Sequence, residues 1–389
     1  MPAGSRPLLR TASIKKSGAA AKPAVTRPAG FATALIRWQK STGRHDLPWQ
    51  QQPDPYRVWL SEIMLQQTQV ATVIPYYRRF LARFPDLTSL AAAPAEEVMA
   101  LWSGLGYYAR ARNLQRAAQL IVAHHGGHFP QRLTDIEALP GIGRSTASAI
   151  AVFAFGARAA ILDGNVKRVL ARAFGIEGFP GQKAVETRLW TLAESLLPSR
   201  DLAAYTQGLM DLGATLCTRA QPRCNVCPVT TACVALREDR VAALPAPRAK
   251  RAVPQRTVKM LVLRQRGRVL LEQRPPHGIW GGLLSLPELP QGKLPHRYAA
   301  AVPLPVVRHA FTHFRLDITP LLCDLNAGET APEGVWLSLK QLDTAPLPAP
   351  VRKILNDVHA GLALSSNFAA ASPLARPNSS AARAKNGVR

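Results

Sequence analysis

The chain contains few acidic residues: 24 Asp and Glu stand against 49 Lys and Arg, which gives a net charge of +25. It also lacks any run of about 18 uncharged apolar residues, so we expect no membrane-spanning helix. Hydrophobic residues nevertheless make up 47% of its 389 residues, which excludes a chain that is disordered throughout. This length predicts two or three domains. The excess of positive charge indicates a polyanionic partner, most often nucleic acid.

Both ends of the chain are basic and free of acid, with nine Lys and Arg in residues 1–45 and four after Asp357. Residues 1–30 lack the apolar centre of a secretory signal. We therefore predict a disordered basic N-terminal arm there, with a transit peptide as the alternative. Residues 359–389 are predicted to form a disordered tail.

Residues 31–239 have the apolar periodicity of helices, interrupted by Gly and Pro, which predicts an all-α region of about ten helices. Residues 240–255 are rich in proline and basic residues and form a predicted linker. Residues 256–358 change to the period of strands, with a hairpin at Gly267. The predicted strands and closing helix are residues 257–263, 268–273, 315–322, 334–337 and 351–359. The fold class is therefore mostly α, followed by a smaller α/β domain.

Four of the five cysteines lie within 17 residues of sequence: Cys217, Cys224, Cys227 and Cys233. Four thiolates this close in sequence can enclose one metal centre. Disulfides require an oxidising compartment, and structural zinc sites usually use two similar short pairs, whereas only one spacing is short here. The uneven spacing favours an iron–sulfur cluster over zinc, which stays the alternative. Cys323 stands alone in an apolar run and is expected to be a core residue.

The letters LPGIG at residues 139–143 connect a short predicted helix to a longer one. Gly141 and Gly143 permit a tight turn and the close approach of another backbone. The following helix presents free N–H groups and the positive end of its dipole, which suit a phosphate. Two glycines alone also fit an ordinary packing joint. The LPGIG form is more specific and predicts a helix-hairpin-helix, which holds the DNA backbone without reading its sequence.

Two carboxylates are candidate catalytic groups. Glu62 has apolar neighbours in the sequence, and burial among them would raise its pKa and suit it to act as an acid. Asp163 follows the hairpin, in the segment ILDGNV. Each has a simpler interpretation, Glu62 as an acid in the first turn of a helix capped by Ser61, and Asp163 as a turn or N-cap residue. The residues alone leave both interpretations open.

The hairpin, an Asp shortly after it and the cysteine loop together resemble the endonuclease-III superfamily of helix-hairpin-helix DNA glycosylases. The letters SEIMLQQTQV from residue 61, GLGYYARAR from residue 104 and ILDGNVKRVL from residue 161 narrow the resemblance to the MutY family of adenine DNA glycosylases. The letters WGGL from residue 280 and HAFTHF from residue 309 are similar to the domain of that family that reads 8-oxoguanine. The resemblance covers the chain outside its two tails.

This resemblance implies a helical unit of two subdomains with the active site in the cleft between them. It also implies a [4Fe–4S] cluster on the four cysteines of loop 217–233, with Arg219 and Arg223 placed against phosphates. For residues 256–358 it implies a Nudix-like fold. That segment lacks the acid-rich R-E-x-x-E-E run, so we expect a binding module and no nucleotide hydrolysis.

The resemblance also implies how the reaction proceeds. The target adenine leaves the stack, and Gln67 and Tyr107 match residues that wedge into the duplex at the lesion. Glu62 matches the acid that protonates N7 of adenine. Asp163 matches the carboxylate that stabilises the oxocarbenium-like sugar, with Asn165 in support. The residues that match the adenine pocket are Trp49, Leu65 and Gln207.

Phe311, Thr312 and His313 correspond to the loop that reads 8-oxoguanine, where the family has Phe-Ser-His. Thr keeps the hydroxyl group of Ser. Relatives that also cut the strand carry, at the position of Ser145, a Lys that forms a Schiff base with the sugar. We therefore expect a monofunctional glycosylase, with Lys167 as a nearby amine for weak trapping of product.

The sequence thus predicts a DNA repair enzyme that removes adenine opposite 8-oxoguanine or guanine in double-stranded DNA. We expect a monomer without membrane association, in the bacterial cytoplasm at the nucleoid, with organellar targeting by the N-terminal arm as the alternative. A second candidate is an endonuclease-III-like pyrimidine glycosylase/lyase, which Ser145 and residues 256–358 oppose. A third is a non-enzymatic iron–sulfur DNA-binding regulator, which would need neither Glu62 nor Asp163.

Overall fold

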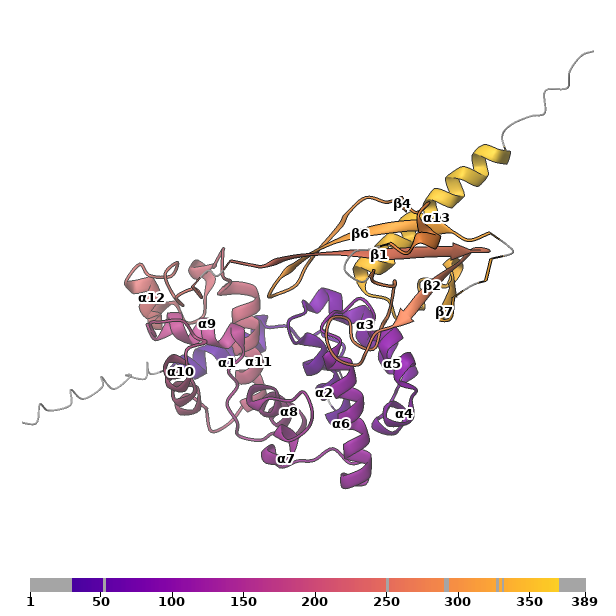
Figure 1. The fold of residues 1–389 in the computed structure, drawn as a ribbon. Helices are drawn as coiled ribbons and strands as arrows, with labels where there is room; N and C mark the ends of the chain where they lie inside the picture. The colour runs from indigo at the N-terminus through magenta and orange to yellow at the C-terminus, as the bar shows by residue number, and fades with distance from the viewer. Residues whose placement is uncertain are drawn as a thin grey trace, which may run out of the picture.

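A helical part comes first in the chain and a part built on a β-sheet follows it (Figure 1). The computed structural model describes residues 30–51, 54–249, 252–289, 294–326, 329–330 and 332–370. Within these ranges no helix is long and apolar enough to cross a membrane. Residues 1–29 of the predicted arm and residues 371–389 of the predicted tail lie outside the described residues.

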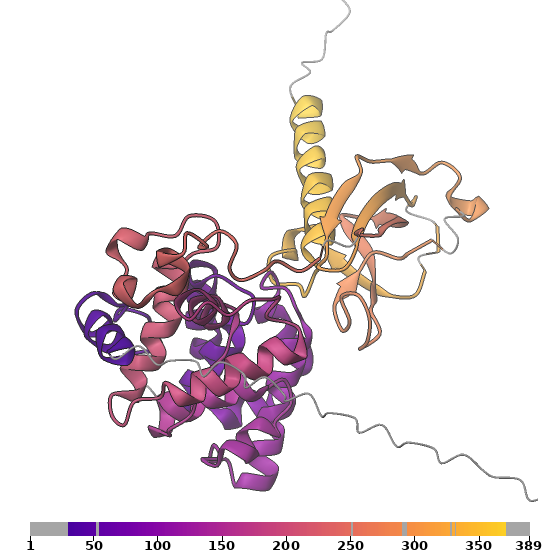
Figure 2. The same ribbon diagram turned by 90° about the vertical axis from the view of Figure 1, so that its left-hand side faces the viewer.

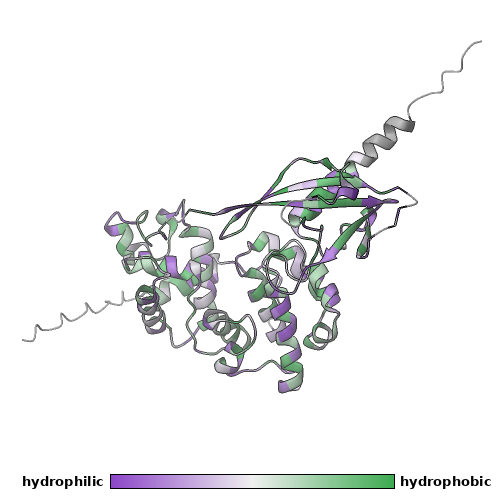
Figure 3. Cartoon of the chain, in the orientation of Figure 1, coloured by the Kyte–Doolittle hydropathy of each residue, from purple (hydrophilic) through white to green (hydrophobic). Residues whose placement is uncertain are grey.

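The hydrophobic core of the first helical subdomain contains Trp59, Phe80 and Trp102, all completely buried, and it continues without a break into the sheet domain. Its helices carry both hydrophobic and hydrophilic residues, as expected of helices with one buried face (Figure 3). They are α2 (Pro55–Leu65), α3 (Val70–Arg83), α4 (Leu87–Ala92), α5 (Ala95–Trp102), α6 (Ala109–His125), α7 (Leu133–Glu137) and α8 (Arg144–Phe155).

The second helical subdomain combines the first helix of the described residues with helices that follow α8, and it has its own core around Leu35, Val166 and Leu212. Its helices are α1 (Phe31–Thr42), α9 (Gly164–Ala173), α10 (Lys183–Ser195) and α11 (Leu202–Asp211). The cysteine region follows as η1 (Leu212–Leu216), η2 (Cys224–Val226), η3 (Thr230–Ala232) and α12 (Val234–Arg237). The predicted helical unit of two subdomains is confirmed. The helices beyond the ten or so that were predicted are short ones, such as α4 and α12.

The β-sheet has β2, β1 and β6 at its centre, and the long strands β1 and β6 are parallel while the other strand pairs are antiparallel. Gly267, with φ +73°, makes the predicted turn between β1 and β2. The strands are β1 (Gln255–Gln265), β2 (Arg268–Gln273), β3 (Leu284–Ser285), β4 (Val302–Pro303), β5 (Val307–Ala310), β6 (Arg315–Asp324) and β7 (Val335–Ser338). Two short helices, η5 (His296–Tyr298) and η6 (Leu339–Gln341), complete the connections.

The closing helix α13 spans Ala349–Ala370, so it extends well past the predicted end at residue 359. The prediction that a disordered tail begins at residue 359 is therefore wrong for residues 359–370. The sequence after His359 is rich in Ala and Leu, which have high helix propensity and allow the helix to continue. Figure 2 shows α13 alongside the sheet, with its far end projecting away from both parts.

Hydrogen bonds fix the sheet domain against α5 and α6 of the first helical subdomain. The hydroxyl of Ser103 donates to the carbonyl oxygen of Leu347 at 2.8 Å, and Nη2 of Arg352 donates to the Ser103 hydroxyl at 3.1 Å. Nη1 of Arg112, on α6, donates to the carbonyl oxygen of Gly281 at 2.6 Å. These contacts determine which face of the helical part the loops of the sheet domain approach.

Candidate active site

Glu62 lies in the second half of α2, which begins at Pro55 with Asp54 as its N-cap. The hydroxyl of Ser61 donates to the carbonyl oxygen of Val58 at 2.8 Å and caps nothing. The interpretation of Glu62 as a first-turn acid capped by Ser61 is therefore wrong. The reason is that the helix starts two turns earlier than that interpretation requires.

The environment of Glu62 favours its protonated form. Burial raises the pKa of the Glu62 carboxyl to about 8, and the negative charge of Asp163 adds to the shift. A carboxylic acid with this pKa keeps its proton near neutral pH and can donate it to a bound group.

Asp163 is the N-cap of α9, and its Oδ1 accepts a hydrogen bond from the backbone N–H of Val166 at 2.7 Å. Burial raises the pKa of Asp163, while backbone N–H donors and the cations of Arg168 and Lys167 oppose the rise. The interpretation of Asp163 as an N-cap is thus correct. It does not exclude a chemical role, because Asp163 also lies close enough to Glu62 to influence its pKa.

The two acids come from different cores, since Glu62 is on α2 and Asp163 starts α9. Asn165 is held beside Asp163, because its Oδ1 accepts from Nη2 of Arg168 at 2.8 Å. A side chain at Gly213 would come within 2.6 Å of the Cβ atom of Asn165. The absence of a side chain there lets η1 pack directly against the first turn of α9.

A cavity of about 350 Å³ opens beside Glu62. Three residues that sequence similarity assigned to an adenine pocket, Trp49, Leu65 and Gln207, line this cavity together with Glu62. The ring of Trp49 packs edge-on against Tyr77, with 5.3 Å between ring centroids. The structure therefore brings Gln207, from α11, together with Trp49 and with Glu62 and Leu65 of α2.

Arg44 also lines this cavity, and sequence analysis missed it as a site residue. In the sequence it was only one of many basic residues near the N-terminus. Its partner is Asp211, a fully buried carboxylate at the end of α11, and the two side chains approach to 2.6 Å. No local pattern marks this pair, because the two residues are far apart in the chain.

A second and larger cavity, of about 940 Å³, lies between the helical part and the sheet domain. Gln67 and Tyr107 line it from the helical side, and both have left-handed backbone conformations, with φ +58° and +48°. Such conformations cost energy in residues other than glycine and are concentrated at functional sites. The side chain of Tyr107 is 45% exposed although it is large and aromatic.

Phe311, Thr312 and His313 line the same cavity from the sheet domain. Phe311 stacks on the buried ring of Phe314, with 4.5 Å between centroids, while Thr312 and His313 are exposed. His313 is therefore not a core residue. The core position of this loop belongs to Phe314, because the chain enters β6 there.

The predicted helix-hairpin-helix is formed by α7 and α8. Gly141 has φ +79°, and a side chain there would lie 2.9 Å from the Cβ atom of Asn113. Gly143 is the N-cap of α8. The Oγ atom of Ser145 accepts a hydrogen bond from the backbone N–H of Leu162 at 2.9 Å, so this side chain lies against the segment that leads to Asp163.

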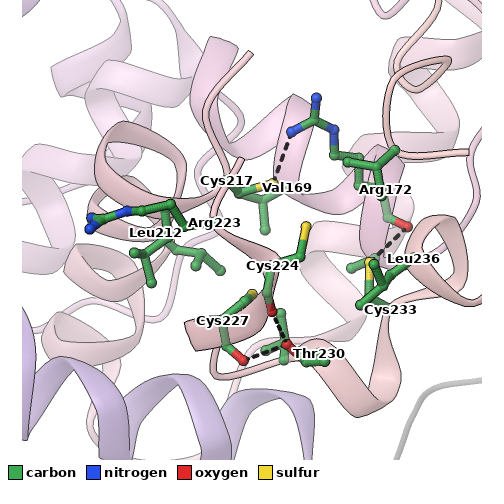
Figure 4. A pocket seen from close by; sticks show the side chains of 14 residues that line it. Val169, Arg172, Leu212, Cys217, Arg223, Cys224, Cys227, Thr230, Cys233 and Leu236 are labelled. Atoms are coloured by element: carbon green, nitrogen blue, oxygen red, sulfur yellow. Dashed lines mark hydrogen bonds between the residues drawn. The ribbon is translucent and has the colours of Figure 1, made fainter. Parts of the chain in front are cut away.

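The four clustered cysteines line one cavity next to α9, and all are free thiols (Figure 4). Nη1 of Arg172 lies 3.4 Å from the sulfur of Cys217. Burial raises the pKa of Cys227 to about 11 and also raises that of Cys233. Within the described residues, no three His, Cys, Asp or Glu side chains are grouped closely enough to hold a single metal ion.

Two arginines lie on the cysteine loop, and the fifth cysteine lies in another part of the structure. Arg219 and Arg223 are exposed on its surface. Cys323 lies in β6, buried in a separate small core with Leu263 and Tyr298, as expected of a core residue.

Comparison with models of known protein families agrees with this architecture. Residues 60–195 match the family described as HhH-GPD superfamily base excision DNA repair protein, and residues 258–357 match the NUDIX domain. A solved thermostable thymine-DNA glycosylase is 30% identical, covers 54% of this chain and 95% of its own, and aligns with a TM-score of 0.49.

Full-length relatives are more informative because they span both parts of the chain. The adenine DNA glycosylase of Buchnera aphidicola subsp. Schizaphis graminum is 35% identical, and the match covers 84% of this chain and 97% of the relative. The human adenine DNA glycosylase is 32% identical, with 85% of this chain and 74% of the relative covered. An identity of this size, over both the helical part and the sheet domain, shows that the chain belongs to the adenine DNA glycosylase family.

Proposed function

We propose that this protein hydrolyses the N-glycosidic bond of adenine opposite 8-oxoguanine or guanine in double-stranded DNA, without cutting the strand. The observation that carries the proposal is the position of Glu62, an acid with a raised pKa, in the wall of a cavity that also contains Trp49, Leu65 and Gln207. The cavity accepts a base that has left the duplex, as chemistry on a stacked base requires.

Each acid has a distinct part in the proposed reaction. Glu62 donates its proton to N7 of the flipped adenine, which makes the base a better leaving group. The sugar then develops positive charge, and the carboxylate of Asp163 stabilises it. Asp163 is suited to this part because backbone N–H donors of its own helix and the cations of Arg168 and Lys167 favour its carboxylate form and oppose the rise in pKa that burial causes. Asn165 supports this arrangement, and water completes the hydrolysis.

The absence of strand cutting rests on Ser145. A lyase needs an amine that attacks the sugar, and a hydroxyl bonded to the backbone of Leu162 does not provide one. An amine that follows Asp163 on α9, Lys167, is already engaged in an ion pair with Glu186 at 2.6 Å. We therefore expect trapping of product through Lys167 to be weak.

Recognition of the opposite base is assigned to the cavity between the two parts of the protein. Gln67 and Tyr107 enter the duplex from the helical side, while Phe311, Thr312 and His313 face the damaged base from the sheet domain. The exposed hydroxyl and imidazole can form hydrogen bonds with a base edge, and each such contact contributes about 1–3 kcal/mol to discrimination. Gly141, Gly143, Arg219 and Arg223 complete the proposed interface through phosphate contacts.

A [4Fe–4S] cluster is proposed as the cofactor, because the residues present fit it. The donors are Cys217, Cys224, Cys227 and Cys233, and apolar side chains make up most of the remaining wall. Arg172 supplies a positive charge next to one of the sulfurs. When bound, the cluster would hold the loop in place for DNA contact. We further propose a monomer that acts on chromosomal DNA in the bacterial cytoplasm.

Base release from defined duplexes tests this proposal. Adenine should be released rapidly from A:8-oxoguanine, more slowly from A:G, and strand breaks should appear only after alkali treatment. Release of thymine glycol instead of adenine would favour the pyrimidine glycosylase/lyase. Binding without any base release would favour the iron–sulfur regulator.

The lesion-reading residues are tested separately. Thr312→Val and His313→Ala each remove one hydrogen bond to the damaged base, so each should lower the rate ratio for A:8-oxoguanine over A:G by about 5- to 100-fold. His296→Ala is the matched control, because His296 is an exposed histidine of the same domain outside this cavity. An unchanged ratio in both variants would place discrimination in the helical part.

A further inference from the structure

The buried pair of Asp211 and Arg44 is connected to the proposed base pocket through Gln207. Gln207 and Asp211 are one turn apart on α11, and Nε2 of Gln207 donates to Oδ1 of Asp211 at 2.8 Å. Gln207 lines the cavity, whereas Asp211 is completely buried behind it. An effect of Asp211 on a bound base would therefore act through the amide of Gln207.

Asp211 is held in a single orientation by Arg44. The backbone N–H of Arg44 donates to Oδ2 at 2.9 Å, and its Nε donates to Oδ1 at 2.7 Å. A buried carboxylate requires such partners, because an unpaired buried charge is strongly destabilising. In all three of these hydrogen bonds, two from Arg44 and one from Gln207, the oxygens of Asp211 act as acceptors.

This acceptor determines which end of the Gln207 amide faces it. The amide has an NH₂ group that donates and a carbonyl oxygen that accepts. If the amide turned over, Oε1 would meet Oδ1 of Asp211, and two acceptors would repel each other. The NH₂ group is therefore committed to Asp211, and no donor in the described part of the chain bonds to Oε1.

Such an orientation has a direct consequence for base selection. Adenine carries an amine at C6, a donor, whereas hypoxanthine and guanine carry a carbonyl oxygen, an acceptor, at the same position. An oxygen fixed at Oε1 attracts the amine and repels the carbonyl. We propose that Asp211 and Arg44 are positioning residues that orient Gln207 so that the site accepts a 6-aminopurine and rejects a 6-oxopurine. This inference rests on the base pocket of the proposed function.

The test compares release of adenine and of hypoxanthine, each placed opposite 8-oxoguanine, by the full-length protein. Asp211→Asn can donate to Gln207 and so allows the amide to turn over. We expect the single-turnover rate ratio for adenine over hypoxanthine to fall at least tenfold in this variant. Asp201→Asn is the matched control, since it breaks an exposed ion pair with Lys40 immediately before the same helix and should leave the ratio unchanged.

A purely structural role of Asp211 would lower both rates by the same factor, and that result would overturn the proposal. If Asp211→Asn does not fold, the double substitution Arg44→Met with Asp211→Leu replaces the buried pair by apolar side chains, which proteins often tolerate. It also frees the amide, so the ratio should fall similarly. Gln207→Met should lower the ratio as well, and adding Asp211→Asn to it should have no further effect on the ratio.

These outcomes are distinguishable from failure of the proposed function. If the wild-type protein does not release adenine, the pocket assignment itself is wrong. If it does so and Asp211→Asn keeps the wild-type ratio, only the positioning role is refuted.

Discussion

Substitution of Glu62 by Gln is expected to abolish adenine release while DNA binding persists. Gln has nearly the same shape as Glu but has no acidic proton to donate. Loss of a general acid typically lowers a rate about 100- to 10,000-fold. Because α2 is otherwise unchanged, the cavity and the contacts to DNA should survive.

The pKa of Glu62 sets the expected pH dependence. With a pKa of about 8, roughly nine in ten Glu62 side chains are protonated at pH 7, against fewer than about one in 100 for an ordinary glutamate. As pH rises through about 8, Glu62 loses its proton and the chemical step loses its general acid. Above that pH the rate should fall about tenfold per unit.

The same shift predicts an effect on stability. The folded protein holds the Glu62 proton up to about pH 8, whereas the unfolded chain releases it near pH 4.5. The folded state thus binds more protons in this window, and the wild-type protein loses stability as pH rises through it. Glu62→Gln removes this loss, which we expect to be on the order of a few kcal/mol at pH 8. For a domain of the size of the helical part, each kcal/mol raises Tm by about 2–4 °C.

Single-turnover release of adenine between pH 5 and 9 and melting curves over the same range measure both effects. Glu96→Gln, at an exposed position on α5, is the control and should behave as wild type. The reasoning is refuted if Glu62→Gln retains a near wild-type rate. It is equally refuted if the melting temperatures of the two proteins stay parallel from pH 5 to 8.

Three further predictions concern other parts of the molecule. Asp163→Asn should keep its Tm, because Asn caps a helix as well as Asp does, but should lose adenine release. If the variant retained most of its activity, Asp163 would act only as a helix cap. Changing any one of Cys217, Cys224, Cys227 or Cys233 to Ser should lower iron and sulfide content, visible absorbance and DNA affinity, whereas Cys323→Ser should lower none of them; a protein that holds only zinc would contradict the cluster. Arg112→Met removes the hydrogen bond to Gly281 and should lower the preference for A:8-oxoguanine over A:G with little change in the rate on A:G; an equal loss on both duplexes would contradict a role in placing the sheet domain.

Local patterns were sufficient to predict the fold class. Apolar periodicity predicted the helices, and Gly267 between two strand-like runs predicted the first hairpin, which the structure confirms. The position of Glu62 in its helix was readable too, because Asp54 and Pro55 form a typical helix start. The end of α13 was harder to predict, because Ala-rich sequence occurs both in disordered tails and in helices.

The candidate site could be predicted only in part from the sequence. Motifs pointed to Glu62 and Asp163 one at a time, but the mutual effect of their charges appears only once two cores pack together. The contact of Arg44 with Asp211 joins residues with 166 others between them, and neither residue belongs to a recognisable motif. Long-range pairs of this kind depend on tertiary structure, so spacing in the sequence does not reveal them.

The position of α1 in the second helical core has a consequence for synthesis on the ribosome. Phe31 and Leu35 are buried against residues of α9 and α11, which are translated more than 120 residues later. At about 5–20 residues per second, α1 waits roughly 6–25 s for its partners, while the intervening helices α2 to α8 can already pack against one another. The nascent chain therefore exposes one apolar helix face during this interval, which makes α1 a natural target for chaperones. Glu62 is synthesised before Asp163, so the proposed active site between the two acids forms only after α9 has joined α1 in the second helical core.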